Sequence, residues 1–234
     1  MSPKGIPSVY VVSMRRRKDR QAFMVNQLHP IEPLFSFEVA RDYDGSAEVL
    51  DWGSYRLFPW QIASNNFWWN RPLKLGEIGC FLAHIGCWQH AASQKHLDHA
   101  FFFEDDAFLQ VKSLSQLHPT VDDLSLADPN WDLLYFGRNS LGPDRGELGE
   151  FVSPGYSYLA HAYALSRRGL EKILAYKPET MVMPADEFLP ATFMPHPRRD
   201  IADVVKPLLN AYATRTTVVG TVPKEVFGSD TELG

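Results

Sequence analysis

Short apolar runs alternate along the chain with segments in which apolar residues recur every three or four positions. The apolar runs are typical of strands, and they lie at 9–14, 34–40, 100–106, 131–137, 156–166 and 218–222. The periodic segments predict helices at 18–28, 76–96 and 166–176, the last capped by Ser166, and a short proline-broken helix at 183–193. Strands that alternate with helices predict an α/β fold with a mostly parallel sheet flanked by helices. Because no repeat or clear boundary divides the sequence, we expect a single domain over residues 1–234.

Other stretches lack a clear period. Residues 46–73 are irregular and aromatic, and we interpret them as the rim of an active site or as a flap. Residues 113–130 are predicted as mixed helix and loop, and residues 138–152 as a glycine-containing loop. The tail beyond residue 193 is interrupted by prolines before the last predicted strand.

Composition narrows the class of protein. With 45% hydrophobic and 22% charged residues, the chain is typical of a globular protein. Its net charge of −5 argues against general binding of nucleic acid or of an anionic membrane. The sequence has neither a signal peptide pattern nor an apolar stretch of the roughly 18 residues of a membrane span. We therefore expect a cytoplasmic protein, at most peripheral to a membrane, with no integral membrane segment.

The two cysteines, Cys80 and Cys87, fall on one predicted helix. Seven residues place them roughly 10.5 Å apart along the helix axis, too far for a disulfide, whose Cα atoms lie within about 7 Å. One zinc ion could not reach both sulfur atoms with bonds of about 2.3 Å. We interpret both cysteines as buried thiols in a reducing compartment.

Three adjacent carboxylates end an apolar run in FFFEDDAFL (residues 101–109). Burial and mutual repulsion disfavour such a group unless a positive charge lies nearby. In open α/β sheets, ligands bind beyond the carboxyl ends of the strands, and Mg²⁺ or Mn²⁺ there would be held by carboxylates and phosphate oxygens. The alternative is an exposed turn with solvated acids.

Asp186 and Glu187 form a second acidic pair. Pro184 can start a helix and place Asp186 near its N-terminus, where the helix dipole favours an ionised carboxylate. Such a carboxylate can act as a general base on a hydroxyl group. Helix capping is the alternative. Hydrolase chemistry is not indicated because Ser166 lacks a nucleophile elbow, and the chain has neither a P-loop nor a GxGxxG motif.

Taken together, ordered motifs resemble glycosyltransferase family 25, most closely the C-terminal transferase domain of procollagen galactosyltransferases; lipooligosaccharide transferases belong to the same family. The matching segments are YVVSMRRRKDR, DYDG, GEIGCFLAHIGCW, FFFEDD, WDLLYFGR, AYALSRRGLEKIL, ADEFLP and GSDTE. The chain differs from the usual family pattern at Ser13-Met14, where an Asn-Leu pair is common, and at Ala83, where serine is common.

The resemblance implies a GT-A type, Rossmann-like fold and an inverting transfer of galactose from UDP-galactose to a hydroxyl acceptor in β linkage. It implies Mn²⁺, or Mg²⁺ in its place, held by Glu104 and Asp106. Asp186 is the expected general base, with Glu187 as the second choice. The phosphate and uridine contacts are expected among residues of the matching motifs and their neighbours. The expected nucleotide-sugar-binding residues are Ser13, Arg17, Arg20, Asp44, Lys74, Glu77, His84 and Asp105.

Alternatives remain at this point. The donor could be UDP-glucose, and the acceptor a hydroxylysine-type peptide or an oligosaccharide such as a lipooligosaccharide. A different class is a non-catalytic protein that binds a sugar nucleotide, and a third is a metal-dependent phosphoesterase. The intact EDD segment and Asp186 argue against the non-catalytic protein, and the lack of histidines at strand ends argues against the phosphoesterase. The aromatic stretch Phe67-Trp68-Trp69 is expected to stack on the sugar or the acceptor.

Overall fold

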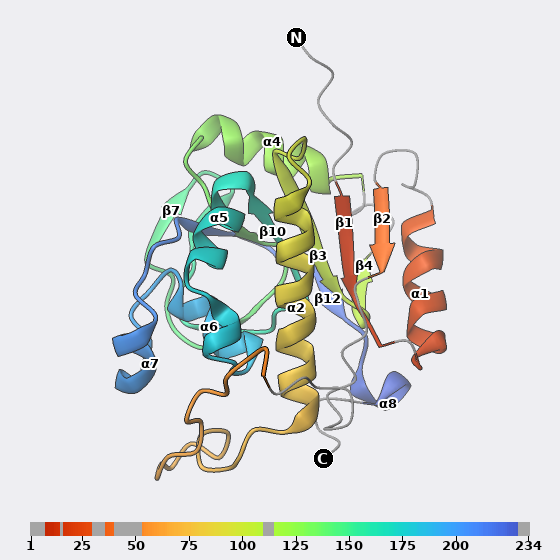
Figure 1. Cartoon of the computed structure of the whole chain (residues 1–234). Coiled ribbons are helices and arrows are strands. Elements are labelled where there is room, and N and C mark those ends of the chain that lie inside the picture. The colour runs from red at the N-terminus through yellow and green to blue at the C-terminus, as the bar shows by residue number, and fades with distance from the viewer. Residues whose placement is uncertain (1–7, 15, 30–35, 40–52, 110–114, 229–234) are drawn as a thin grey trace.

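The computed structural model describes residues 8–14, 16–29, 36–39, 53–109 and 115–228. Its central feature is an eight-stranded sheet in the order β2-β1-β3-β10-β5-β11-β8-β7 (Figure 1). These strands are β1 Ser8–Val12, β2 Ser36–Val39, β3 His99–Glu104, β5 Leu133–Tyr135, β7 Gly146–Leu148, β8 Phe151–Ser153, β10 Ala162–Ser166 and β11 Ala211–Thr214. Two short pairs lie outside this sheet, namely β4 Ala107–Leu109 with β12 Val219–Thr221, and β6 Asn139–Ser140 with β9 Ser157–Tyr158.

The sheet is mixed, yet most of its strands share one direction. Three neighbouring pairs are parallel and four are antiparallel. Only β10 and β8 are reversed, because each of them pairs antiparallel with both of its neighbours. The predicted α/β fold with a mostly parallel sheet flanked by helices is therefore confirmed.

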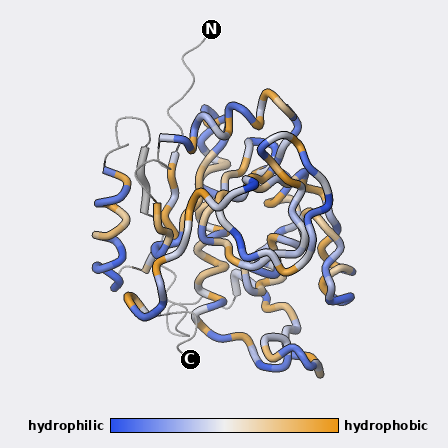
Figure 2. Tube along the Cα trace, turned by 180° about the vertical axis from the view of Figure 1, so that it is seen from behind, coloured by the Kyte–Doolittle hydropathy of each residue, from blue (hydrophilic) through white to orange (hydrophobic). Residues whose placement is uncertain are grey.

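Helices cover both faces of the sheet. On one face α2 (Leu75–Ser93), α5 (Arg167–Ala175) and α6 (Ala185–Ala191) pack against side chains such as Tyr10 and Phe102. On the other face α1 (Lys18–Leu28) and α4 (Leu117–Ala127) pack against the alternate positions, among them Phe101 and Phe103. Successive strand residues point to opposite faces, so FFF supplies both layers of core. In Figure 2, α1 carries both hydrophobic and hydrophilic residues, as the burial of one face requires.

The remaining helical turns are short. They are η2 Pro178–Thr180, α7 Arg199–Val204 and α8 Lys224–Phe227. Together with β11, the helices α7 and α8 lie in the proline-interrupted tail, where the sequence pattern predicts only the strand at 218–222. The predicted loop at 138–152 is wrong in part, because it contains β6 and β7 and the start of β8.

The strand predicted at 156–166 is divided into β9 and β10. Leu159 lies between them with a φ of 78°, a left-handed conformation that strands do not adopt and that non-glycine residues rarely take. The break turns the chain toward the end of β3. The cap predicted for the following helix is confirmed, since the Ser166 hydroxyl accepts a hydrogen bond from the Gly169 backbone N–H at 3.0 Å.

Candidate active site

A pocket of about 420 Å³ opens at the carboxyl end of β3. Glu104 is the last residue of that strand, and Asp105 and Asp106 form the tight turn into β4. Glu104 and Asp106 line the pocket, whereas Asp105, which lies between them in the sequence, is buried behind it. The sequence-based expectation that this segment faces a ligand crevice agrees with this geometry.

Asp105 has a buried partner of its own. Its carboxylate accepts hydrogen bonds from the Arg20 guanidinium and from the Ser13 hydroxyl, each at 2.7 Å. Arg20 also donates to the backbone carbonyl of Gly228 at 2.7 Å. Ser13, Arg20 and Asp105 were expected to contact the nucleotide sugar, and the structure places them in an ion-paired support beneath the turn.

Asp186 reaches the same pocket from the first turn of α6. Burial raises the pKa of Glu104, Asp106 and Asp186 to about 7 each, and repulsion between neighbouring carboxylates adds to the rise. The Arg20 guanidinium, 3.9 Å from Asp106, counteracts the rise at Glu104 and Asp106. Three carboxylates that resist ionisation together make a site that is electrostatically suited to a cation.

One carboxylate oxygen in this group has no hydrogen-bond partner among the described residues. The Oδ1 atom of Asp106 is buried and accepts no hydrogen bond from any described residue. A buried carboxylate oxygen without a donor is unfavourable unless a ligand occupies it. Asp106 and Glu104 therefore fit the expected role of holding Mn²⁺ or Mg²⁺, both of which prefer oxygen ligands.

Glu187 lines the pocket but is held by four donors. Its carboxylate accepts hydrogen bonds from Trp69 Nε1 at 2.7 Å, from the Tyr158 hydroxyl at 2.9 Å, from His196 Nε2 at 2.8 Å and from the Tyr156 hydroxyl. These bonds outweigh burial and lower the pKa of Glu187. A carboxylate so fully occupied is poorly placed to accept a proton, so we retain Asp186 alone as the candidate base.

The irregular aromatic segment forms one side of the pocket. Trp60, Trp68 and Arg71 line it, and the Arg71 guanidinium lies 5.0 Å from the centre of a Trp68 ring. Trp69 turns inward to Glu187, while Phe67 is 72% exposed. The expected rim of the site thus coincides with the described part of the segment, from residue 53 to residue 73.

The other sequence-predicted residues occupy varied places. Arg71 forms a two-pronged ion pair with Glu77, and Glu77 also accepts the backbone N–H of Lys74 at 2.9 Å, which fixes the start of α2. Arg17 pairs with Asp19 and donates to the carbonyl of Phe227. Asp44 lies outside the described residues.

Cys80 lines the pocket from α2, and His84, one turn farther along the same helix, contacts Glu104. His84 is buried, and its Nε2 atom lies 3.3 Å from Glu104 while its Nδ1 atom lies 2.8 Å from the Tyr163 hydroxyl. Burial lowers the pKa of His84 to about 4. Both cysteines are free thiols, as expected, but the expectation that both are buried is wrong for Cys80, which is half-buried and lines the pocket.

Sequence reasoning missed several pocket residues. Arg71 and Lys224 bring positive charge to the pocket, and Cys80 brings a thiol. Arg71 directly follows the aromatic run NNFWWN, a signal of cation–aromatic stacking. The four-residue spacing between Cys80 and His84 puts both on one helix face and could have revealed the pair.

Fold and pocket together define an α/β protein with a pocket at the carboxyl edge of its sheet, where open α/β sheets bind their ligands. The chain belongs to glycosyltransferase family 25: the sequence model of that family, described as "Glycosyltransferase family 25 (LPS biosynthesis protein)", matches residues 6–139.

Curated relatives bear two kinds of name. A "Probable inactive glycosyltransferase 25 family member 3" of Rattus norvegicus is 34% identical over 203 residues, which cover 84% of this chain and 34% of the relative. "Procollagen galactosyltransferase 2" of Mus musculus is 29% identical over 202 residues, covering 82% of this chain and 31% of the relative. The chain spans about a third of the length of these relatives. Family membership alone therefore does not decide whether the chain is active.

A solved structure with a partial likeness is the mannose-1-phosphate geranyltransferase of Thermus thermophilus. It matches with a TM-score of 0.40 and 11% identity, covering 89% of this chain and 73% of the other. Within the described residues, no helix combines the length and the apolar character needed to cross a membrane.

Proposed function

We propose that this chain is an inverting, metal-dependent galactosyltransferase. It transfers galactose from UDP-galactose to a hydroxyl group and forms a β linkage. Relatives named as procollagen galactosyltransferases support galactose as the sugar, and the acceptor is a hydroxylysine-type peptide or an oligosaccharide. The observation that carries the proposal is the carboxylate group at one pocket, in which Asp106 keeps a buried oxygen without a protein donor among the described residues.

Glu104 and Asp106 are the residues that would hold Mn²⁺, or Mg²⁺ in its place. When bound, the ion supplies Lewis-acid stabilisation of the charge that develops on the diphosphate leaving group. Arg71 and Lys224 are the pocket cations that would contact the phosphates. The exposed face of Trp68 offers a surface on which a sugar ring can stack.

Asp186 is the proposed general base. In a single in-line displacement the acceptor oxygen bonds to the anomeric carbon as the bond to the UDP oxygen breaks, and the acceptor proton passes to the Asp186 carboxylate. One displacement inverts the anomeric centre. The pKa of Asp186, raised to about 7 mainly by burial, is suited to proton acceptance near neutral pH.

Donor binding can be tested by thermal shift. UDP-galactose with Mn²⁺ is expected to raise the melting temperature, because a ligand that binds only the folded state stabilises it. UDP-glucose and UDP alone serve as comparisons, and a chelator should remove the effect. If no UDP-sugar raises the melting temperature in the presence of Mn²⁺, the proposal is wrong.

A second experiment tests Asp186. Asp186→Asn should abolish transfer to hydroxylysine peptide or oligosaccharide acceptors while preserving UDP binding. The matched control is Asp203→Asn, since the Asp203 side chain is 80% exposed. Loss of UDP binding together with transfer would assign Asp186 a structural role instead.

The alternative function is that of a non-catalytic protein that binds a sugar nucleotide. It is favoured by the relatives whose names call them inactive. This alternative predicts a thermal shift with UDP-galactose but no release of UDP with any acceptor, and Asp186→Asn would then change nothing measurable in an activity assay.

A further inference from the structure

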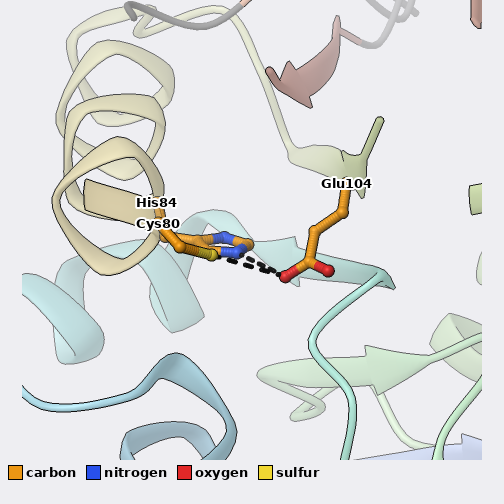
Figure 3. A group of neighbouring side chains, drawn as sticks. All are labelled: Cys80, His84 and Glu104. Atoms are coloured by element: carbon orange, nitrogen blue, oxygen red, sulfur yellow. Dashed lines mark hydrogen bonds and ion pairs between the residues drawn. The ribbon is translucent and has the colours of Figure 1, made fainter. Parts of the chain in front are cut away.

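Three different donor atoms converge at the inner end of the pocket. Cys80, His84 and Glu104 point toward one another in Figure 3, and their ligand atoms all lie within 4.8 Å of one another. The Cys80 sulfur is 3.7 Å from Glu104 Oε1, and His84 Nε2 is 3.3 Å from the same oxygen. Within the part of the chain that the structure describes, these three side chains form a group of cysteine, histidine and acidic ligands that could hold one metal ion.

The convergence follows from the fold. Cys80 and His84 are four residues apart on α2, so their side chains lie one turn apart on the same face. That face packs toward β3, whose last residue is Glu104. Cys87, almost two turns farther along, is buried in the core.

The distances suit a tetrahedral ion. With Zn–S bonds of about 2.3 Å and Zn–N or Zn–O bonds of about 2.0–2.1 Å, neighbouring ligand atoms of a tetrahedron lie about 3.3–3.6 Å apart. The two separations given above are close to this range and all three ligand atoms lie within 4.8 Å of one another, so one ion can bind once the side chains draw together. Thiolate and imidazole ligands select Zn²⁺ over Mn²⁺ and Mg²⁺, which prefer oxygen donors.

The surroundings support a ligand role for His84. Its Nδ1 atom lies 2.8 Å from the Tyr163 hydroxyl, which also accepts Trp88 Nε1–H at 2.9 Å. Such an outer hydrogen bond fixes the orientation of a metal-binding imidazole and leaves its other nitrogen for the ion. Cys80 and Glu104 border the pocket, which gives an ion a route of entry and leaves a fourth position open.

We propose that Cys80, His84 and Glu104 form a Zn²⁺ site with its fourth position open to the pocket. Binding releases to solvent the Cys80 thiol proton and any proton that Glu104 carries, and no electron is transferred. In the zinc-bound state the neutral imidazole coordinates through Nε2 and carries its proton on Nδ1, which then donates to the Tyr163 oxygen. Glu104 is also one of the two proposed Mn²⁺ ligands. Zn²⁺ bound at this site therefore makes Glu104 unavailable to Mn²⁺ and inhibits transfer.

Metal binding is tested on the untagged, chelator-treated chain. Titration with Zn²⁺ against a chromogenic chelator should give one tight site per chain. Titration with Co²⁺ should give the thiolate-to-metal charge-transfer absorption in the near ultraviolet. Cys80→Ser should abolish that absorption and weaken Zn²⁺ binding by at least about 100-fold, more than the ~10–100-fold typical of losing an outer hydrogen-bond partner.

Cys87→Ser is the matched control and should keep both signals. His84→Gln is a second variant, which should weaken Zn²⁺ binding while the Cys80 thiolate still gives a weaker cobalt absorption. Absence of tight Zn²⁺ binding by the unaltered chain, or binding unchanged in folded Cys80→Ser, would overturn the site.

The inhibitory consequence rests on the proposed function and has its own readout. Zn²⁺ should inhibit Mn²⁺-supported transfer by the unaltered chain, and Cys80→Ser should be resistant at the same Zn²⁺ concentration. If the chain transfers no sugar, the cobalt and zinc titrations still decide the site. Equal inhibition of the unaltered chain and of Cys80→Ser would overturn the inhibitory role alone.

Discussion

Asp106 combines a functional position with an unfavourable environment. Its pKa is raised from 3.8 to about 7, first by burial and then by repulsion from Glu104. A carboxyl group whose pKa is higher in the folded state than in the unfolded state destabilises the fold once it ionises. The metal-free protein therefore keeps this group at the expense of stability.

Asp106→Asn removes the charge while keeping the shape. At pH 8 and without metal, we expect the free energy of unfolding to rise by on the order of 1–2 kcal/mol, and transfer to be lost. At about pH 2.5, where the carboxyl is protonated in both the folded and the unfolded state, the variant should match the unaltered chain. Urea unfolding at the two pH values checks this, and lower stability of the variant at pH 8 would contradict it.

Glu187 has the opposite character, because its carboxylate accepts all four donors around it. Glu187→Gln replaces one acceptor oxygen by an NH₂ group. This group then faces hydrogen-bond donors, and neither it nor those donors has an acceptor. We expect a loss of about 2–4 kcal/mol in the free energy of unfolding. Glu171→Gln, at an exposed position, is the control and should change little. A Glu187→Gln variant as stable as this control would show that the four bonds contribute little.

For single residues, the sequence predicted which carboxylates lie together but not which of them line the pocket. Glu104, Asp106 and Asp186 were expected at one site and do share a pocket. Adjacent acids, such as Asp105 and Asp106, point to different sides of the chain. The sequence does not reveal which of the two sides faces the pocket, because that depends on where the strand ends. The place of Cys80 in the pocket was not predicted, because its neighbour Glu104 lies at the end of β3, 24 residues away in the sequence.

Among the elements, α1 joins the turn after β3 to the last turn of the described chain. Arg20 on α1 pairs with buried Asp105 and with the carbonyl of Gly228, next to α8. Both side chains of the Arg20–Asp105 pair are less than one-tenth exposed. The ion pair therefore holds three separate segments together.

Arg20→Ala leaves the Asp105 carboxylate buried without its counter-ion. We expect a loss of about 3–5 kcal/mol in the free energy of unfolding, measured by urea denaturation. Adding Asp105→Asn to Arg20→Ala should restore part of the lost free energy of unfolding, because the buried charge without a counter-ion is removed. Arg215→Ala is the control, because the exposed pair of Arg215 with Glu147 should contribute at most about 1 kcal/mol. Equal effects of the two arginine substitutions would refute the role assigned to Arg20.

Long periodic elements were predictable, whereas short ones were not. The helix predicted at 18–28 matches α1, and that at 76–96 matches α2 within a few residues. Strands of two or three residues, such as β6 and β7, are too short to show a period. The break at Leu159 also escaped prediction, because leucine gives no local signal for a positive φ.

For the whole molecule, ion binding and protonation are linked. Glu104, Asp106 and Asp186 have pKa values near 7 in the metal-free fold, so they bind protons between about pH 4 and 7 that the unfolded chain has lost. The contribution of these groups to stability is therefore present at low pH and is lost as the pH rises through about 7. At the proposed metal site, a divalent cation would replace those protons.

Mn²⁺ should consequently raise the melting temperature more at pH 7.5 than at pH 5, where protons compete for the carboxylates. Calorimetric titration in two buffers of different ionisation enthalpy should detect proton release on Mn²⁺ binding. Asp106→Asn should reduce both effects. A shift independent of pH would mean that Mn²⁺ binds elsewhere.

The segment from residue 53 to residue 73 brings Trp60, Trp68 and Arg71 to the pocket without contributing a helix. It is fastened by Trp69 to Glu187 and by backbone bonds to residues 179–182. The carboxylates proposed to handle the ion and the proton lie outside it, on β3, its turn and α6. In the proposed transferase, recognition is assigned to this irregular segment and the reaction to the sheet edge and α6, as is common where loops on a rigid scaffold carry function. An enzyme divided in this way can acquire a new acceptor by replacing one stretch of sequence while its chemistry is inherited intact.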